Sequence, residues 1–180
     1  MKRSFLKKRF VVMAALVLCS SLVSAQNTIT CSIEEAAGII GTLEARGPGY
    51  YEFQLSGQNR SYVESMFGYD TTNPFAEIVE TMRQLPEGYY ISLDCTRMQL
   101  PKDPPSLTFH NYYEATLRHL NDIDSLASII LPSGMIEADS ILNGCKNLVK
   151  VFIPATIEKL PAFKGSPNVK VSIAAGNPYY

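Results

Sequence analysis

The chain is poor in the residues and motifs from which active sites are built. Its 180 residues include no tryptophan and two histidines, His110 and His119. No glycine-rich dinucleotide motif, phosphate-binding loop or G-x-S-x-G nucleophile elbow occurs in the sequence. These absences disfavour nucleotide-dependent enzymes and serine hydrolases, and we expect no cofactor.

The few candidate catalytic groups lack partners in the sequence. Glu114 follows His110 by four residues, but the spacing is not H-E-x-x-H and no third metal ligand is placed. Asp94 is expected at the end of a strand, where α/β enzymes often hold catalytic acids, and Cys95 and Cys145 lack a Cys-x-x-Cys spacing. We therefore expect a protein that is not an enzyme and holds no metal. One catalytic alternative stays open, an unrecognised hydrolase that uses His110 or Asp94.

Cysteine is also scarce, and its distribution argues against a disulfide-stapled fold. Beyond the N-terminal segment the chain has Cys31, Cys95 and Cys145, which are odd in number and far apart. We expect buried free thiols, because cysteine is among the residue types most often buried. One disulfide between two of the three stays open at this point.

Residues 1–25 predict an export signal. Five positive residues lie between Lys2 and Arg9, and the apolar run 11–18 that follows is too short to span a bilayer. Val23-Ser24-Ala25 offers small residues before a cleavage site that we place after Ala25. An N-terminal membrane anchor is the alternative; we expect no membrane span once the signal is removed.

Removal of this signal makes the chain acidic. The full sequence has 16 Lys and Arg and 17 Asp and Glu, and all five charges of the first 25 residues are positive. The remaining 11 basic and 17 acidic residues give a net charge of −6. Phosphate backbones would repel such a chain, so we expect no nucleic-acid partner.

Residues 26–96 predict an α/β cap domain. Ser32 and Glu35 form a capping box that begins an amphipathic helix over 33–45, and Asn73-Pro74 begins a second helix over 74–85. Alternating apolar residues predict strands near 51–55 and 90–95, while 26–31 reads as a strand or a linker. The order predicts a βαβ unit. Residues 97–124 predict a proline-rich connection, with a surface loop at 97–106 and a helical segment after it.

Residues 125–180 repeat themselves. The segment that begins at Leu126 matches one that begins at Leu148, 22 residues later, and a shortened third copy begins at Val169. A period of 20–29 residues with an L-x-x-L-x-L core is typical of leucine-rich repeats, in which each unit adds one strand to a parallel stack. The fold class predicted is α/β, with the cap followed by a short solenoid of two repeats and a partial third.

The repeat motif also resembles a known family. The run 141–160 contains Gly-Cys-x-x-Leu-x-x-Val-x-Ile-Pro, and Asn177-Pro178-Tyr179-Tyr180 follows the last copy. Both are similar to the BspA-like surface leucine-rich repeats, and the cap is similar to the segment that precedes the repeats in spirochaetal members. The resemblance implies a secreted or surface-exposed protein, with adhesins for host matrix proteins or other bacteria among its relatives. It implies a buried position for Cys145 and no catalytic residues.

These features together predict a binding protein. The outward positions of the repeat strands form the candidate partner-binding face, which consists of Ser128, Ile130, Lys150, Phe152 and Ser172. We expect a protein ligand from a host matrix or another bacterial surface, at the cell surface or outside it. The runner-up is a periplasmic structural or carrier protein. Packing of Ile130 and Phe152 beneath the cap or beneath the 97–124 segment is the alternative to their exposure. The short array suggests a truncated relative or a fragment, or self-association through its open C-terminal edge.

Overall fold

A computed structural model describes residues 27–58, 74–99, 120–139 and 141–180. The predicted signal peptide, the helix cap Asn73, and His110, Glu114 and His119 lie outside these residues. No helix within the described ranges is long and apolar enough to cross a membrane.

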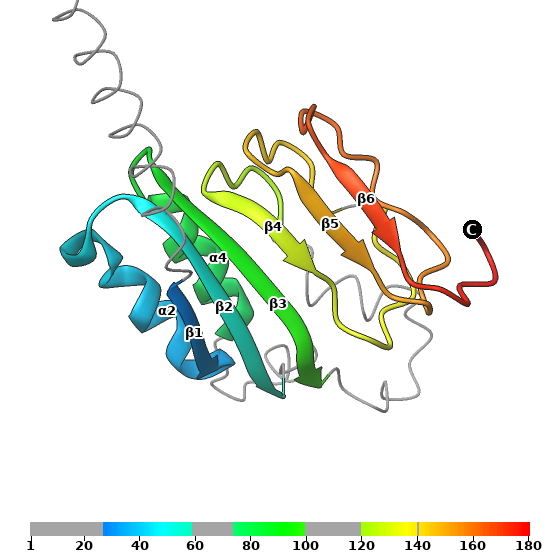
Figure 1. Ribbon diagram of the computed structural model, residues 1–180, viewed down its shortest axis with the longest axis horizontal. Coiled ribbons are helices and arrows are strands. Elements are labelled where there is room, and N and C mark those ends of the chain that lie inside the picture. The colour runs from blue at the N-terminus through cyan, green and yellow to red at the C-terminus, as the bar shows by residue number, and fades with distance from the viewer. Residues whose placement is uncertain (1–26, 59–73, 100–119, 140) are drawn as a thin grey trace, which may run out of the picture.

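The protein is built on one open sheet of six strands, and every neighbouring pair is parallel. The strands lie in the sheet in the order in which they occur in the sequence (Figure 1). They are β1 (Asn27–Ser32), β2 (Gly49–Gln58), β3 (Tyr89–Gln99), β4 (Leu126–Ile130), β5 (Lys150–Ile153) and β6 (Lys170–Ile173). The prediction of an α/β protein with a parallel sheet is confirmed.

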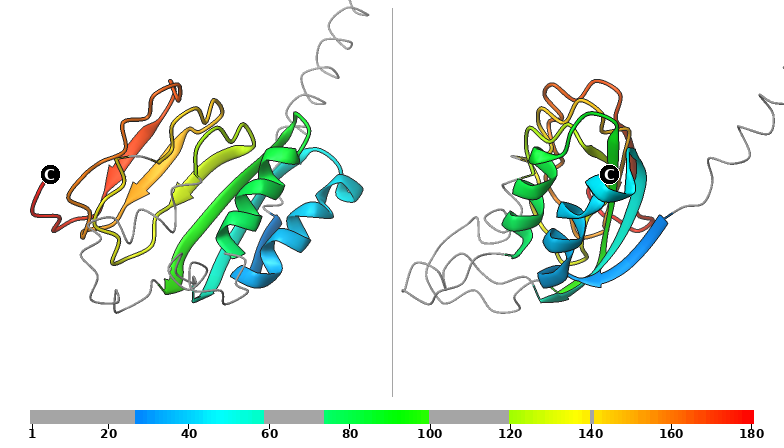
Figure 2. Two further views of the ribbon diagram at one scale, coloured as in Figure 1. Left: turned by 180° about the vertical axis from the view of Figure 1, so that it is seen from behind. Right: turned by 90° about the vertical axis from the view of Figure 1, so that its left-hand side faces the viewer.

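Two helices cover one face of the first three strands. α2 (Ile33–Gly41) connects β1 to β2, α4 (Pro74–Gln84) precedes β3, and both lie on the same side of the sheet (Figure 2). The predicted capping box begins α2, because the Ser32 side chain accepts from the Glu35 backbone N–H and Glu35 reaches back to the Ser32 N–H at 3.0 Å. Hydrogen bonds to the Glu35 carboxylate lower its pKa.

The structure divides the helix predicted over 33–45. α2 ends at Gly41, where Thr42 donates its hydroxyl to the Ile39 carbonyl at 2.7 Å, and the 3-10 helix η1 (Leu43–Arg46) follows. Glycine and threonine both have low helix propensity, which explains the break.

The strand predicted at 90–95 is also longer in the structure. β3 continues to Gln99, pairing with β2 as far as Gln58, and a register shift near Cys95 maintains the pairing. The prediction that Asp94 ends a strand is therefore wrong, and residues 97–99 belong to the sheet rather than to a surface loop.

The segments that begin at Leu126, Leu148 and Val169 supply neighbouring parallel strands, as the repeat predicts. Ile129 pairs with Val151, which pairs with Val171. The return segments between these strands also hydrogen-bond to one another: Ala138 N donates to Lys159 O at 3.0 Å, and Glu158 N donates to Ile136 O at 2.7 Å. Neighbouring turns of the chain thus hydrogen-bond to each other both in their strands and in their return segments.

The turns that lead into β4, β5 and β6 share one conformation. Asp122, Gly144 and Gly165 occupy equivalent places with φ of 55°, 70° and 75°. Asn143 N donates to the Asn121 side chain at 2.8 Å, and Lys164 N donates to the Asn143 side chain at 2.9 Å. The periodic backbone therefore begins at about Leu120, inside the segment that the sequence assigns to the connection.

One apolar core runs under the whole sheet. It joins inward residues of β1–β3 and the two helices to inward residues of β4 and β5 and the return segments. Most of these inward side chains are buried, but Ile29 on the edge strand β1 is half-buried and Val171 on β6 is 40% exposed, because no described strand covers either edge. The cap and the repeats thus share their interior.

Gly144 provides a test of the stacked turns. A Cβ atom at this position would collide with the Asp122 carboxylate and lie 3.3 Å from the Asp122 Cα atom, whereas one at Gly134, which also has positive φ, would meet nothing within 4 Å. We expect Gly144→Ala to lower the free energy of unfolding by about 2–4 kcal/mol and Gly134→Ala by about 1 kcal/mol, since only the first adds a clash to the left-handed strain. Urea denaturation measures both; equal losses would show that the turns do not stack in this way.

Adjacent residues of β5 test which side of the sheet faces the core. Ile153 is fully buried and Phe152, on the opposite face, is partly exposed. We expect Ile153→Ala to destabilise the protein by about 2–5 kcal/mol. Phe152→Ala should lower the free energy of unfolding by about 1 kcal/mol or less, because it removes only a cross-strand contact on the surface of the sheet. The reverse order of the two costs in thermal or chemical unfolding would contradict the register.

Candidate functional site

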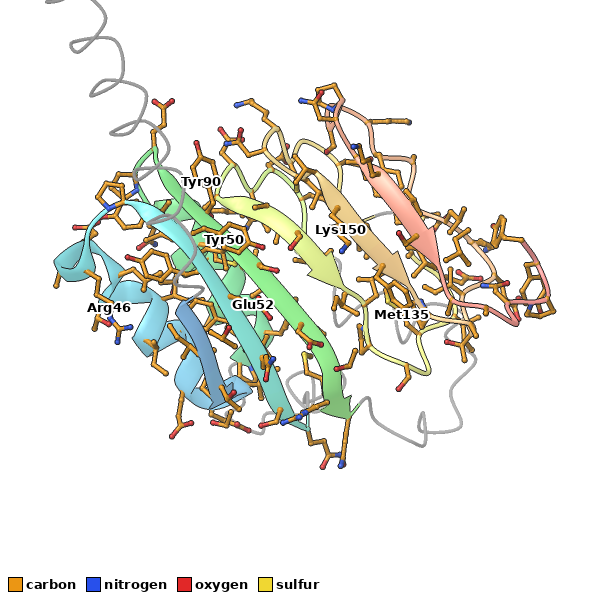
Figure 3. All side chains as sticks on the ribbon, in the orientation of Figure 1. Arg46, Tyr50, Glu52, Tyr90, Met135 and Lys150 are labelled. Carbon is orange, nitrogen blue, oxygen red and sulfur yellow. The ribbon has the colours of Figure 1, made fainter. Side chains whose placement is uncertain are left out.

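The sheet face turned away from α2 and α4 is the candidate functional site, and we call it the outer face. No described helix or return segment covers it, and Figure 3 shows Tyr50, Tyr90, Glu52 and Lys150 on this side. Because side chains alternate along a strand and the strands are in register, its residues form rows across the sheet. Two rows cross all six strands: Thr28, Glu52, Ser92, Ser128, Lys150 and Lys170 in the first, and Thr30, Gln54, Asp94, Ile130, Phe152 and Ser172 in the second.

All five predicted site residues lie in these rows. Ser128 and Lys150 are register partners in the first row, and Ile130, Phe152 and Ser172 are consecutive in the second. Lys150 and Ser172 are exposed, and the other three are half-buried. Ile130 and Phe152 therefore form an apolar pair in a row whose other members are polar.

The outer face extends further than the repeat predicts. β3 pairs with β4, so Ser92 lies beside Ser128 and Asp94 lies beside Ile130. Residues of β1, β2 and β3 thereby join the predicted ones in a single surface. Their outward positions could be found from the alternation in the sequence, but nothing in the sequence places β3 next to β4.

Charge is distributed unevenly over this face. Glu52 on β2 and Asp94 on β3 are acidic, and Arg97 on β3 is an exposed cation in register with Ser56, whereas Lys150 and Lys170 on β5 and β6 are both basic. Asp94 accepts hydrogen bonds at Oδ1 from the Thr96 backbone N–H at 3.0 Å and from the Thr96 hydroxyl at 2.7 Å. It thus holds a local turn of β3, and no described residue pairs with it as a catalytic dyad would.

The three cysteines offer little nucleophilic chemistry. Cys31, Cys95 and Cys145 are buried free thiols, as the sequence predicts. Burial raises the pKa of all three, with a nearby carboxylate adding to the effect at Cys31 and Cys95. A raised pKa suppresses the thiolate that would react or bind metal. Among the described residues no group of three or more His, Cys, Asp and Glu is placed to hold a metal ion.

A cleft of about 730 Å³ lies at the amino ends of β3–β5, beside the end of α4. Its two cations already bind carboxylates of the chain: Arg83 contacts Glu80 and Lys146 contacts Asp124, each at 2.9 Å. The hydrogen bond with Asp124 raises the pKa of Lys146. Because both cations are already paired with carboxylates of the chain, we assign no reaction to the cleft.

Comparison with known proteins does not assign the chain to a family. No family model matches it, and no match was found among curated proteins or solved structures. Its relation to the BspA-like repeats therefore stays a prediction from its own residues.

Proposed function

We propose that the protein is exported and binds a protein partner through the outer face, acting as an adhesin toward host or bacterial surfaces. In this proposal residues 120–180 are leucine-rich-repeat coils of the BspA-like type, and the α/β cap is their N-terminal end. The protein has no catalytic role.

The repeat assignment is supported by the periodic hydrogen bonding. Residues 20–22 apart pair in the strands, in the turns and in the return segments. Ser166 takes the place of Cys145 in the third turn, accepts from the Cys145 N–H at 3.0 Å and donates to the Leu142 carbonyl at 2.9 Å. A buried residue that bonds to the neighbouring turn is what a stacked repeat needs, because an isolated turn leaves its polar groups unpaired.

The observation that carries the binding proposal is the Ile130–Phe152 pair on the outer face. The two side chains are register partners on β4 and β5, and both are partly accessible to solvent. Apolar and aromatic residues within a polar surface are the usual centre of protein interfaces. Lys150 and Ser172 supply the polar positions beside them.

Binding can be tested on immobilised collagen, laminin and whole bacterial cells with Phe152→Asp. We expect this change to weaken capture of the partner at least about tenfold, because a charge replaces the aromatic residue at the centre of the interface. Ile136→Asp is the matched control, since Ile136 is exposed on a return segment rather than on the outer face. Equal loss in both variants, or unchanged binding by folded Phe152→Asp, would remove the outer face from the proposal.

Display at the cell surface has its own test. Protease added to intact cells should degrade the protein while leaving a periplasmic marker whole. The runner-up, a periplasmic structural or carrier protein on the same scaffold, predicts complete protection until the outer membrane is opened.

A further inference from the structure

β6 forms one edge of the six-stranded sheet, and no described strand lies beyond it (Figure 1). In a parallel pair, the N–H and C=O groups of one residue point to the same neighbouring strand, and those of the next residue point to the opposite side. The Lys170 and Ala174 N–H groups donate to carbonyls at the two ends of the β5 segment, at 3.0 and 2.9 Å. The backbone groups of Val171 and Ile173 therefore point to the open edge.

The apolar side of this edge is open as well. Val171 continues the inward row of Ile129 and Val151, which are buried, but is itself exposed. Tyr179 and Tyr180, in the last turn, are the two most exposed large apolar side chains of the described residues. At the other edge of the sheet, α2 covers the core side of β1 (Figure 2). β6 therefore combines outward backbone groups with an uncovered end of the core, and a further extended strand would cover both.

The sequence of β6 is complementary to itself when two copies run antiparallel. If Ser172 lies opposite Ser172 of the second copy, Val171 lies opposite Ile173 and Lys170 lies opposite Ala174. Val171 and Ile173 then form two hydrogen-bonded pairs with the second copy, and their side chains meet on the core side. No two like charges are opposed, because each lysine faces an alanine.

We propose that β6 binds β6 of a second copy of this chain, in an antiparallel two-fold pairing centred on Ser172. Each copy uses the same edge, so the assembly closes after two copies. Opposed residues of paired strands point to the same side of the sheet, so both outer faces lie on one side of the dimer. The two Phe152 side chains are then three strand spacings apart, or about 14 Å.

This pairing does not depend on the proposed function, but it has a consequence for it. Two equivalent outer faces on one side of a dimer would strengthen capture of a surface that presents its ligand repeatedly.

Other occupants of the edge predict different assemblies. Parallel pairing of β6 with β1 of a second copy would leave one free edge of each kind and would grow into an open chain of molecules. It would also bury less apolar surface, because α2 already covers the core side of β1. A strand supplied by a different protein would leave the purified protein monomeric.

Sedimentation equilibrium of the purified protein, at up to about 1 mM, tests the pairing. We expect a monomer–dimer equilibrium with a Kd on the order of 100 µM, because a four-residue edge gives a small interface. Val171→Lys should raise this Kd at least about tenfold, since an ammonium group would lie where Ile173 of the second copy packs. Val149→Lys is the matched control and should leave the Kd unchanged, because Val149 is also exposed but precedes β5. Far-UV circular dichroism establishes that both variants are folded.

Cysteine crosslinking tests the register with substitutions outside the core. Ser172→Cys places two thiols at a non-hydrogen-bonded pair with Cα atoms about 4.5 Å apart, which a disulfide can join. Lys170→Cys places them four residues out of register, about 13 Å apart, which a disulfide cannot span. We expect diamide to link the first variant into dimers and to leave the second unlinked. The unsubstituted protein, whose described cysteines are buried, gives the background.

Three outcomes would overturn the inference: a monomer at every concentration, assemblies that grow beyond two copies, and equal crosslinking of the two cysteine variants. Absence of any captured partner in a protein that dimerises would remove the proposed function and leave this pairing in place.

Discussion

The pairing of β3 with β4 is the contact on which the rest of the molecule depends. It joins Ile91 to Leu126 and Leu93 to Ile129, and so connects the helix-covered strands to the repeated ones. Without it the apolar edge of each part would face water, because the inward side chains on both sides belong to one core. A parallel sheet buried on this face tolerates no slip by one residue, since a slip would turn every inward side chain outward.

The repeated turns extend the same parallel sheet beyond β3. A left-handed residue, Asp122, Gly144 or Gly165, precedes each strand, and backbone hydrogen bonds join the first turn to the second and the second to the third. The last turn ends differently: Asn177 is buried and donates to the Ile157 carbonyl at 2.9 Å, while Tyr180 donates to the Glu158 carbonyl at 2.9 Å. These bonds satisfy carbonyls that would otherwise lack a neighbour along this return segment.

The outer face follows from these constraints. Once the inward side is fixed by the core, alternation leaves the other side chains in rows across six strands. The half on β2 and β3 carries Tyr50 and Tyr90 with charges of both signs, and the half on β4–β6 carries the Ile130–Phe152 pair and two lysines.

The sequence by itself determined the local structure. The capping box at Ser32, the alternation in β2 and β3, the 22-residue period and the five outward positions in the repeats all follow from spacing, because helix and strand periodicity act over a few residues. Only the tertiary structure decided that β3 pairs with β4, that β3 runs past Asp94 to Gln99, and that Tyr50 reaches Ser128. These depend on contacts between residues up to 78 positions apart, and such contacts leave no periodic mark in the sequence.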